Sequence, residues 1–136
     1  MVVDWIELVK ELERRLEKWK EDEKISKDEF LNNIDKQDSI CYNMMIAIQC
    51  AIDLGNFIIQ SKKFETPATY AEIFEILGRH KILDKKLAEE MQILARTRNV
   101  LAHLYWKIDL LRVFRVLKTK RKILEKFLKK VKGVLK

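Results

Sequence analysis

Three side chains with the capacity for chemistry lie close together in one short, otherwise largely apolar stretch. Arg98, His103 and Tyr105 all fall within residues 98–105. A histidine exchanges a proton near neutral pH, and an arginine is a permanent cation whose paired donors match phosphate oxygens. The stretch is therefore a candidate site whose residue types would suit proton transfer and the binding of an anion.

The spacing of the arginine and the histidine complicates a site within a single helix. Five residues of an ideal helix rotate by about 140°, so Arg98 and His103 would lie on different faces. Either the helix breaks, or two chains contribute to one site. A third interpretation pairs Arg98 with a buried acid such as Asp53 and makes His103 a core histidine. Spacing alone leaves these alternatives open.

Other catalytic or metal-binding patterns are missing from the sequence. The second histidine, His80, lies in a basic stretch after a predicted helix end, which is typical of a solvated turn. Cys41 and Cys50 lie in one predicted helix about 13 Å apart, so they cannot form a disulfide within it, and we interpret them as small core residues. No H-x-x-x-H, C-x-x-C or glycine-rich phosphate loop occurs. We expect no metal site and no cofactor.

The elements that must position this stretch are predicted to be helices, because the chain has only three glycines and one proline. Apolar periodicity predicts helices over residues 3–19 and 36–61. Capping residues predict further helices that begin near Ser26, Thr69, Asp84 and Asp109, with Gly78 ending the one that begins at Thr69. We expect one all-α domain over residues 1–136, an up-and-down bundle of five or six helices, the last a single basic helix.

The net charge is +7 and is unevenly distributed, since residues 112–136 contain Glu125 as their one acid. This bias permits an anionic partner such as RNA, although a charge-rich stretch is more often a solvated helix face. The sequence has no uninterrupted apolar run of about 18 residues and no secretory leader pattern. We expect a cytoplasmic protein with no membrane partner.

The stretch around Arg98 resembles the HepT family, which comprises minimal toxins of the HEPN superfamily. The family hallmark is Arg, four residues, His, any residue and Tyr, and Asn99 supplies the polar residue that follows the arginine. Looser similarities are the block of residues 67–74 and the helix that contains Gln49, Asp53 and Asn56. The basic C-terminal segment is longer and richer in lysine than the hallmark requires.

The resemblance implies a metal-independent endoribonuclease toxin of a type II toxin–antitoxin system. In such an enzyme the 2′-hydroxyl of the RNA is the nucleophile, His103 takes its proton, and Arg98 stabilises the phosphorane. Asn99 would orient the substrate or His103, and Tyr105 would donate a hydrogen bond to phosphate.

The resemblance also implies two protein partners. The first is a second copy of the chain, because the motifs of two subunits meet in one cleft in the resembled toxins. The second is an MNT-type nucleotidyltransferase antitoxin that transfers AMP to Tyr105, with steric masking as the weaker alternative.

Two other function classes remain open at this point. One is a non-catalytic nucleotide- or substrate-binding subunit that partners a nucleotidyltransferase, and the other is a purely structural helical dimer. The intact set of Arg98, His103 and Tyr105 favours the ribonuclease.

Overall fold

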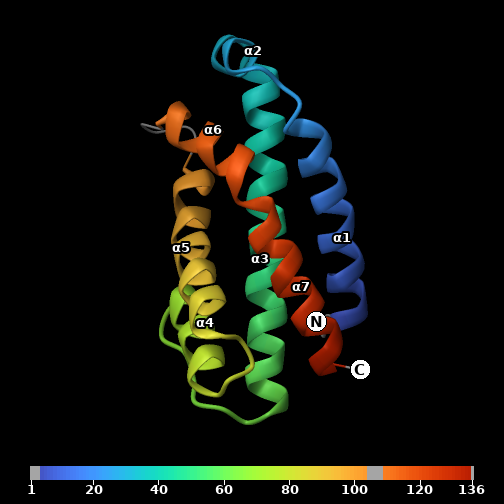
Figure 1. The fold of residues 1–136 in the computed structure, drawn as a ribbon, viewed down its shortest axis with the longest axis vertical. Helices are drawn as coiled ribbons and strands as arrows, with labels where there is room; N and C mark the ends of the chain where they lie inside the picture. Colours follow the sequence, from blue (N-terminus) through green and yellow to red (C-terminus); the bar gives the residue numbers. More distant parts are fainter. Residues whose placement is uncertain (1–3, 104–108, 136) are drawn as a thin grey trace.

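A computed structural model describes residues 4–103 and 109–135 of the chain. The helices in this part are α1 (Trp5–Asp22), α2 (Lys27–Asn32), α3 (Ile34–Ser61), α4 (Tyr70–Arg79), α5 (Lys85–Ala102), α6 (Leu110–Thr119) and α7 (Arg121–Leu135). The long helices alternate in direction: α1 and α5 run upward and α3 and α7 downward in Figure 1. The short helices α2, α4 and α6 lie between them along the chain, so the all-α up-and-down bundle is confirmed.

The predicted capping residues begin the helices as expected. The side chains of Ser26 and Thr69 accept hydrogen bonds of 3.1 Å from backbone N–H groups in the first turns of α2 and α4. Asp84 accepts one of 2.8 Å at α5, and Asp109 accepts one of 3.1 Å at α6. These bonds satisfy N–H groups that have no partner within the helix, which is why the sequence marks these starts clearly.

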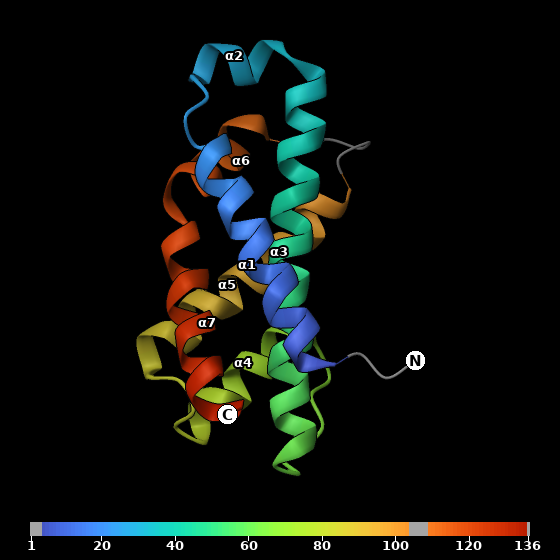
Figure 2. The ribbon, with the colours of Figure 1, turned by 90° about the vertical axis from the view of Figure 1, so that its right-hand side faces the viewer.

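The prediction of one continuous C-terminal helix is wrong, because α6 ends before Lys120 and α7 begins after it. Residues 118–122 contain no apolar side chain, so the stripe that would pack on the bundle is interrupted for more than one turn. The junction is held by the connection between α1 and α2. There Lys118 donates a 2.8 Å hydrogen bond to the carbonyl of Ile25, and Arg121 pairs with Glu23 at 2.6 Å. The chain therefore turns and sends α7 back along the bundle (Figure 2).

The predicted role of Gly78 as the end of its helix is also wrong. Lys81 is the residue in the left-handed conformation, with φ of 60°. Its N–H donates to the carbonyl of Gly78 at 3.1 Å, and the N–H of Ile82 donates to that of Leu77 at 2.9 Å, which is the Schellman ending of a helix. A Cβ on Gly78 would lie 2.8 Å from the Cβ of Ala88. The glycine thus permits close approach of α4 and α5.

The central helix α3 supplies much of the hydrophobic core. Its length and composition would suit a membrane span, but most of its apolar window is buried inside the bundle. Trp19 of α1 is fully buried and donates a 2.8 Å hydrogen bond from Nε1 to the carbonyl of Leu117. Cys41 and Cys50 are buried free thiols, and burial raises their pKa values to about 12 and about 11. Both cysteines are core residues, as predicted.

Candidate active site

Helix α5 carries the candidate residues at its C-terminal end. Its apolar face is buried against the bundle, with Leu94, Ala95 and Leu101 each 1% exposed. The helix ends at Ala102, and His103 is its C-cap residue with φ of −108° and ψ of 41°. Residues 98–102 are all helical, so the rotation of about 140° still separates Arg98 from His103, and a helix break between the two residues is not what the structure shows.

Arg98 is half-buried and is held by two neighbouring polar side chains. Its Nε donates a 2.9 Å hydrogen bond to Oε1 of Gln49 on α3, and its Nη1 donates a 3.4 Å bond to Oδ1 of Asn99. The guanidinium carbon lies 5.8 Å from the centre of the Tyr70 ring, within the range of a cation–π contact. An arginine has five N–H donors, so the contacts made by the described residues leave donors available for an anion.

The alternative in which Arg98 forms an ion pair with Asp53 is not what the structure shows. Within the described residues, Arg98 reaches Asp53 through Gln49, whose Nε2 donates a 2.9 Å hydrogen bond to Oδ1 of Asp53. Desolvation raises the pKa of Asp53, while the Gln49 hydrogen bond and the Arg98 charge act in the opposite direction. The carboxylate therefore orients Gln49, and the guanidinium has no directly bonded counter-ion in the described part of the chain.

A cleft of about 470 Å³ lies beside this chain of hydrogen bonds. Its walls come from three parts of the sequence, with Asp53 and Asn56 on α3, residues 67–70 before and at the start of α4, and Asn99 on α5. The looser family similarities noted in the sequence thus converge on one cleft. Gly55 allows α4 to close against α3, since a Cβ there would lie 2.8 Å from a methyl carbon of Ile73.

The structure places the other predicted site residues as follows. His103 is exposed and lies one helical turn beyond Asn99, at a spacing that puts both on one side of the helix end. It does not line the cleft and is not a core histidine. Tyr105, the predicted modification site, lies outside the described residues.

Gln49 and Tyr70 contact Arg98 but were not assigned a role from the sequence. Gln49 and Asp53 are spaced by four residues within a largely apolar helix, and this spacing was the available signal that they interact. Nothing local marked Tyr70 as a neighbour of Arg98. Among the described residues, no group of three or more His, Cys, Asp or Glu side chains could hold a metal ion.

Comparison with known proteins identifies the family. The model of the ribonuclease HepT-like family matches residues 6–131, and the chain belongs to this family. A tRNA nuclease HepT from Aphanizomenon flos-aquae is 33% identical over 101 residues, which cover 74% of this chain and 69% of that protein. An mRNA nuclease HepT from Shewanella oneidensis is 22% identical over 105 residues, covering 77% of this chain and 79% of that one. YutE from Bacillus subtilis is 28% identical over 90 residues, which span 62% of its length.

Solved structures show the same fold. A tri-AMPylated HEPN toxin of Shewanella oneidensis in complex with an MNT antitoxin superposes with a TM-score of 0.86 at 20% identity, covering 98% of this chain and 99% of that one. YutE, described as a cytosolic protein of unknown function, superposes with a TM-score of 0.81 at 21% identity, covering 96% and 87%.

Proposed function

We propose that this protein is a cytoplasmic, metal-independent endoribonuclease toxin that cleaves RNA through Arg98 and His103. Family membership and the nuclease names of two relatives support the reaction class. The observation that carries the proposal is the guanidinium of Arg98, which Gln49 fixes at 2.9 Å beside the Asn99 cleft. A positioned cation with unused N–H donors can stabilise a phosphate that gains negative charge during the reaction.

The reaction follows from the chemistry of these side chains. The 2′-oxygen of RNA attacks the adjacent phosphorus while His103 takes the 2′-proton, and Arg98 stabilises the charge on the phosphorane. The bond from phosphorus to the 5′-oxygen then breaks, and that oxygen gains a proton from solvent. The products are a 2′,3′-cyclic phosphate and a 5′-hydroxyl. Asn99, which accepts a hydrogen bond from Arg98 and lies one helical turn before His103, orients the substrate.

We propose a homodimer as the working form. In the resembled toxins two motifs meet in one cleft, and this chain carries apolar side chains near its own motif that a partner would cover. Ile93 on α5 is 51% exposed and Leu111 on α6 is 44% exposed. Light scattering should give twice the chain mass at micromolar concentration, and a strictly monomeric protein that still cleaves RNA would exclude a composite site.

The decisive experiment uses the two histidines of the chain. RNA cleavage should persist in EDTA and should fall by at least about 100-fold in His103→Ala and in Arg98→Ala. His80→Ala is the matched control, because His80 lies on a turn and pairs with Glu65 at 2.6 Å. Equal activity of His103→Ala and His80→Ala, or rescue of EDTA-treated enzyme by divalent metal, would refute the proposed mechanism.

A non-catalytic nucleotide-binding subunit is the second candidate function. The cleft supports it, because about 470 Å³ lined by Tyr70 and Asn99 suits a single nucleotide. This candidate predicts saturable nucleotide binding that Asn99→Ala weakens, with no RNA cleavage by the purified protein. The ribonuclease predicts cleavage that depends on His103.

We further propose that an MNT-type nucleotidyltransferase antitoxin silences the toxin by transferring AMP to Tyr105. An adenylate there would add negative charge near the phosphate-binding arginine and repel RNA. Co-expression followed by peptide mass spectrometry should find AMP on the peptide with Tyr105 and not on those with Tyr42 and Tyr70, the other two tyrosines. If Tyr105→Phe is neutralised equally well, steric masking is the better account.

A further inference from the structure

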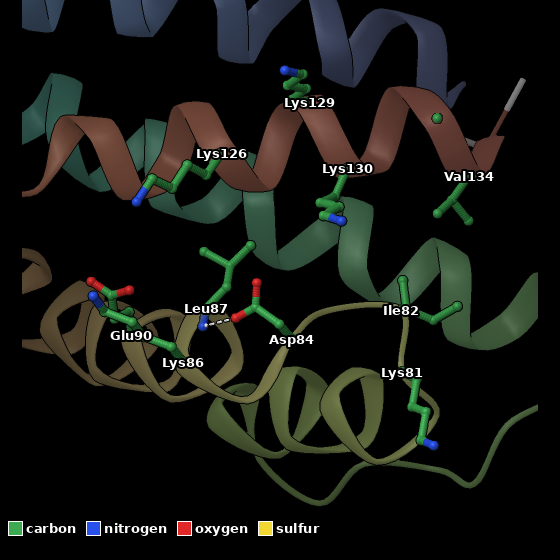
Figure 3. Close-up of a pocket in the computed structure, with 11 residues that line it drawn as sticks. Lys81, Ile82, Asp84, Lys86, Leu87, Glu90, Lys126, Lys129, Lys130 and Val134 are labelled. Carbon is green, nitrogen blue, oxygen red and sulfur yellow. Dashed lines mark hydrogen bonds between the residues drawn. The ribbon is translucent and has the colours of Figure 1, made fainter.

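A second cleft lies at the opposite end of α5 from His103, where the start of α5 faces the C-terminal half of α7 (Figure 3). Its volume is about 610 Å³, and its lining includes five lysines: Lys81, Lys86, Lys126, Lys129 and Lys130. Lys126 and Lys130 extend from α7 toward α5 in Figure 3, whereas the side chain of Lys129 points away from α5. Two acids, Asp84 and Glu90, also line the cleft, so five positive and two negative charges leave a net charge of +3.

The ammonium groups of the five lysines do not stabilise the described fold through polar contacts. In residues 4–103 and 109–135 none of their ammonium groups makes a hydrogen bond or an ion pair, whereas that of Lys132 on α7 pairs with Glu13 at 2.7 Å. Of the two acids, Asp84 is already engaged, because its carboxylate accepts the 2.8 Å hydrogen bond from the N–H of Leu87. The positive charge of the cleft is therefore left for a ligand.

Two of the lysines occupy positions at which a lysine destabilises a helix or its end. Lys86 lies in the first turn of α5, which has no acidic residue, and a cation at that end opposes the helix dipole. Lys81 adopts φ of 60° at a position that glycine usually occupies. Residues that break a local rule without a structural gain are typical of functional surfaces.

We propose that this lysine cleft is a second RNA-binding surface, which holds the phosphate backbone of the substrate away from the cleavage site. The inference rests on the proposed ribonuclease function and deepens it. Lysines act as point charges for phosphate and do not read bases. The floor of Ile82, Leu87 and Val134 contains no aromatic ring for base stacking. The surface therefore binds RNA without regard to sequence.

The position of the cleft suits one extended RNA strand that reaches both sites. Arg98 lies about 16 Å along the axis of α5 from Leu87, and His103 about 24 Å. RNA that spans this distance gains affinity from the lysines, whereas a dinucleotide at the cleavage site does not reach them. The cleft should lower KM for long RNA and leave kcat unchanged.

The test measures binding of 2′-O-methyl RNA about 20 nucleotides long. This RNA has no free 2′-hydroxyl, so binding is observed without cleavage. The variant Lys126→Gln/Lys129→Gln/Lys130→Gln keeps good helix formers at exposed positions of α7. We expect its dissociation constant at low salt to rise by about 10- to 100-fold, and the slope of log affinity against log salt to fall by about 2.

The matched control is Lys10→Gln/Lys20→Gln/Lys27→Gln, which removes the same charge from exposed positions on α1 and α2. Its affinity for the RNA should stay within about threefold of the unmodified protein. Dinucleotide cleavage should be unchanged in both variants, and KM for long RNA should rise in the cleft variant only.

Several outcomes would overturn the assignment. Equal RNA affinity of the two variants would remove the cleft from RNA binding, even if cleavage remains dependent on His103. A cleft variant that binds RNA normally but no longer binds the antitoxin would assign the cleft to a protein partner. A change in its mass by light scattering would make the cleft an interface between copies. If no cleavage depends on His103, the proposed ribonuclease function is refuted. Binding of the 2′-O-methyl RNA then still shows whether the cleft binds RNA.

Discussion

Replacing Gln49 with methionine tests whether the hydrogen-bonded chain behind Arg98 positions it for reaction. The side chains are similar in length, but methionine is only a weak acceptor for Nε of Arg98 and cannot donate to Asp53. A hydrogen bond to a charged group contributes about 1.5–3 kcal/mol when buried. Arg98 is half-buried and water replaces part of that contact, so we expect a loss of stability of about 1 kcal/mol.

The effect on catalysis should exceed the effect on folding. A guanidinium that is no longer fixed must be oriented during the reaction, and we expect kcat to fall by about 10- to 100-fold, or about 1.4–2.7 kcal/mol of transition-state stabilisation. The affinity for inert RNA should change little, because the arginine and its charge remain. Timed cleavage assays measure kcat, and fluorescence anisotropy measures the affinity for the uncleavable RNA.

The control for this variant is Asp53→Asn, which keeps an acceptor for Nε2 of Gln49 but removes the negative charge. If the carboxylate acts only by orienting Gln49, this variant should lose less than about threefold in kcat. Cleavage by Gln49→Met at the rate of the unmodified protein would show that Gln49 does not position Arg98, and that the 2.9 Å contact has no catalytic role.

Three further predictions concern stability and reactivity. The first concerns the two lysines with positive φ, Lys81 at 60° and Lys63 at 56°. Replacing either with glycine should raise the free energy of unfolding by about 0.5–1 kcal/mol in urea titrations, and only Lys81→Gly should also weaken RNA binding. If neither variant is more stable than the unmodified protein, the conformational argument is refuted. The pKa of Glu65 is lowered from 4.5 to about 2, by a backbone hydrogen bond and then by its bond to His80. The stability that Glu65 adds relative to Glu65→Gln should therefore be complete above about pH 4.5 and should disappear as the pH falls toward 2. Burial raises the pKa values of Cys41 and Cys50. Iodoacetamide should therefore modify the native protein at least about 100-fold more slowly than the urea-unfolded chain. Comparable rates would contradict the placement of the two cysteines in the core.

The sequence by itself determined the features that depend on neighbouring residues. N-caps at Ser26, Thr69, Asp84 and Asp109 are local interactions within three or four residues, so the pattern marked the helix starts. The hallmark residues Arg98 and His103 could be recognised because their spacing is also local. Helix ends were less certain, since Lys81 takes a conformation that favours glycine and Gly78 does not.

The tertiary structure decided what lies beside those residues. Gln49 and Arg98 are 49 positions apart, and only the packing of α3 against α5 turns them into a hydrogen-bonded pair. The lysine cleft likewise exists because α7 turns after Lys120 and returns beside the start of α5. A hydrophobic pattern specifies which face of each helix is buried, but the partner helix is selected by how all the faces pack together. Contacts between distant segments therefore follow from the fold as a whole and not from any one segment.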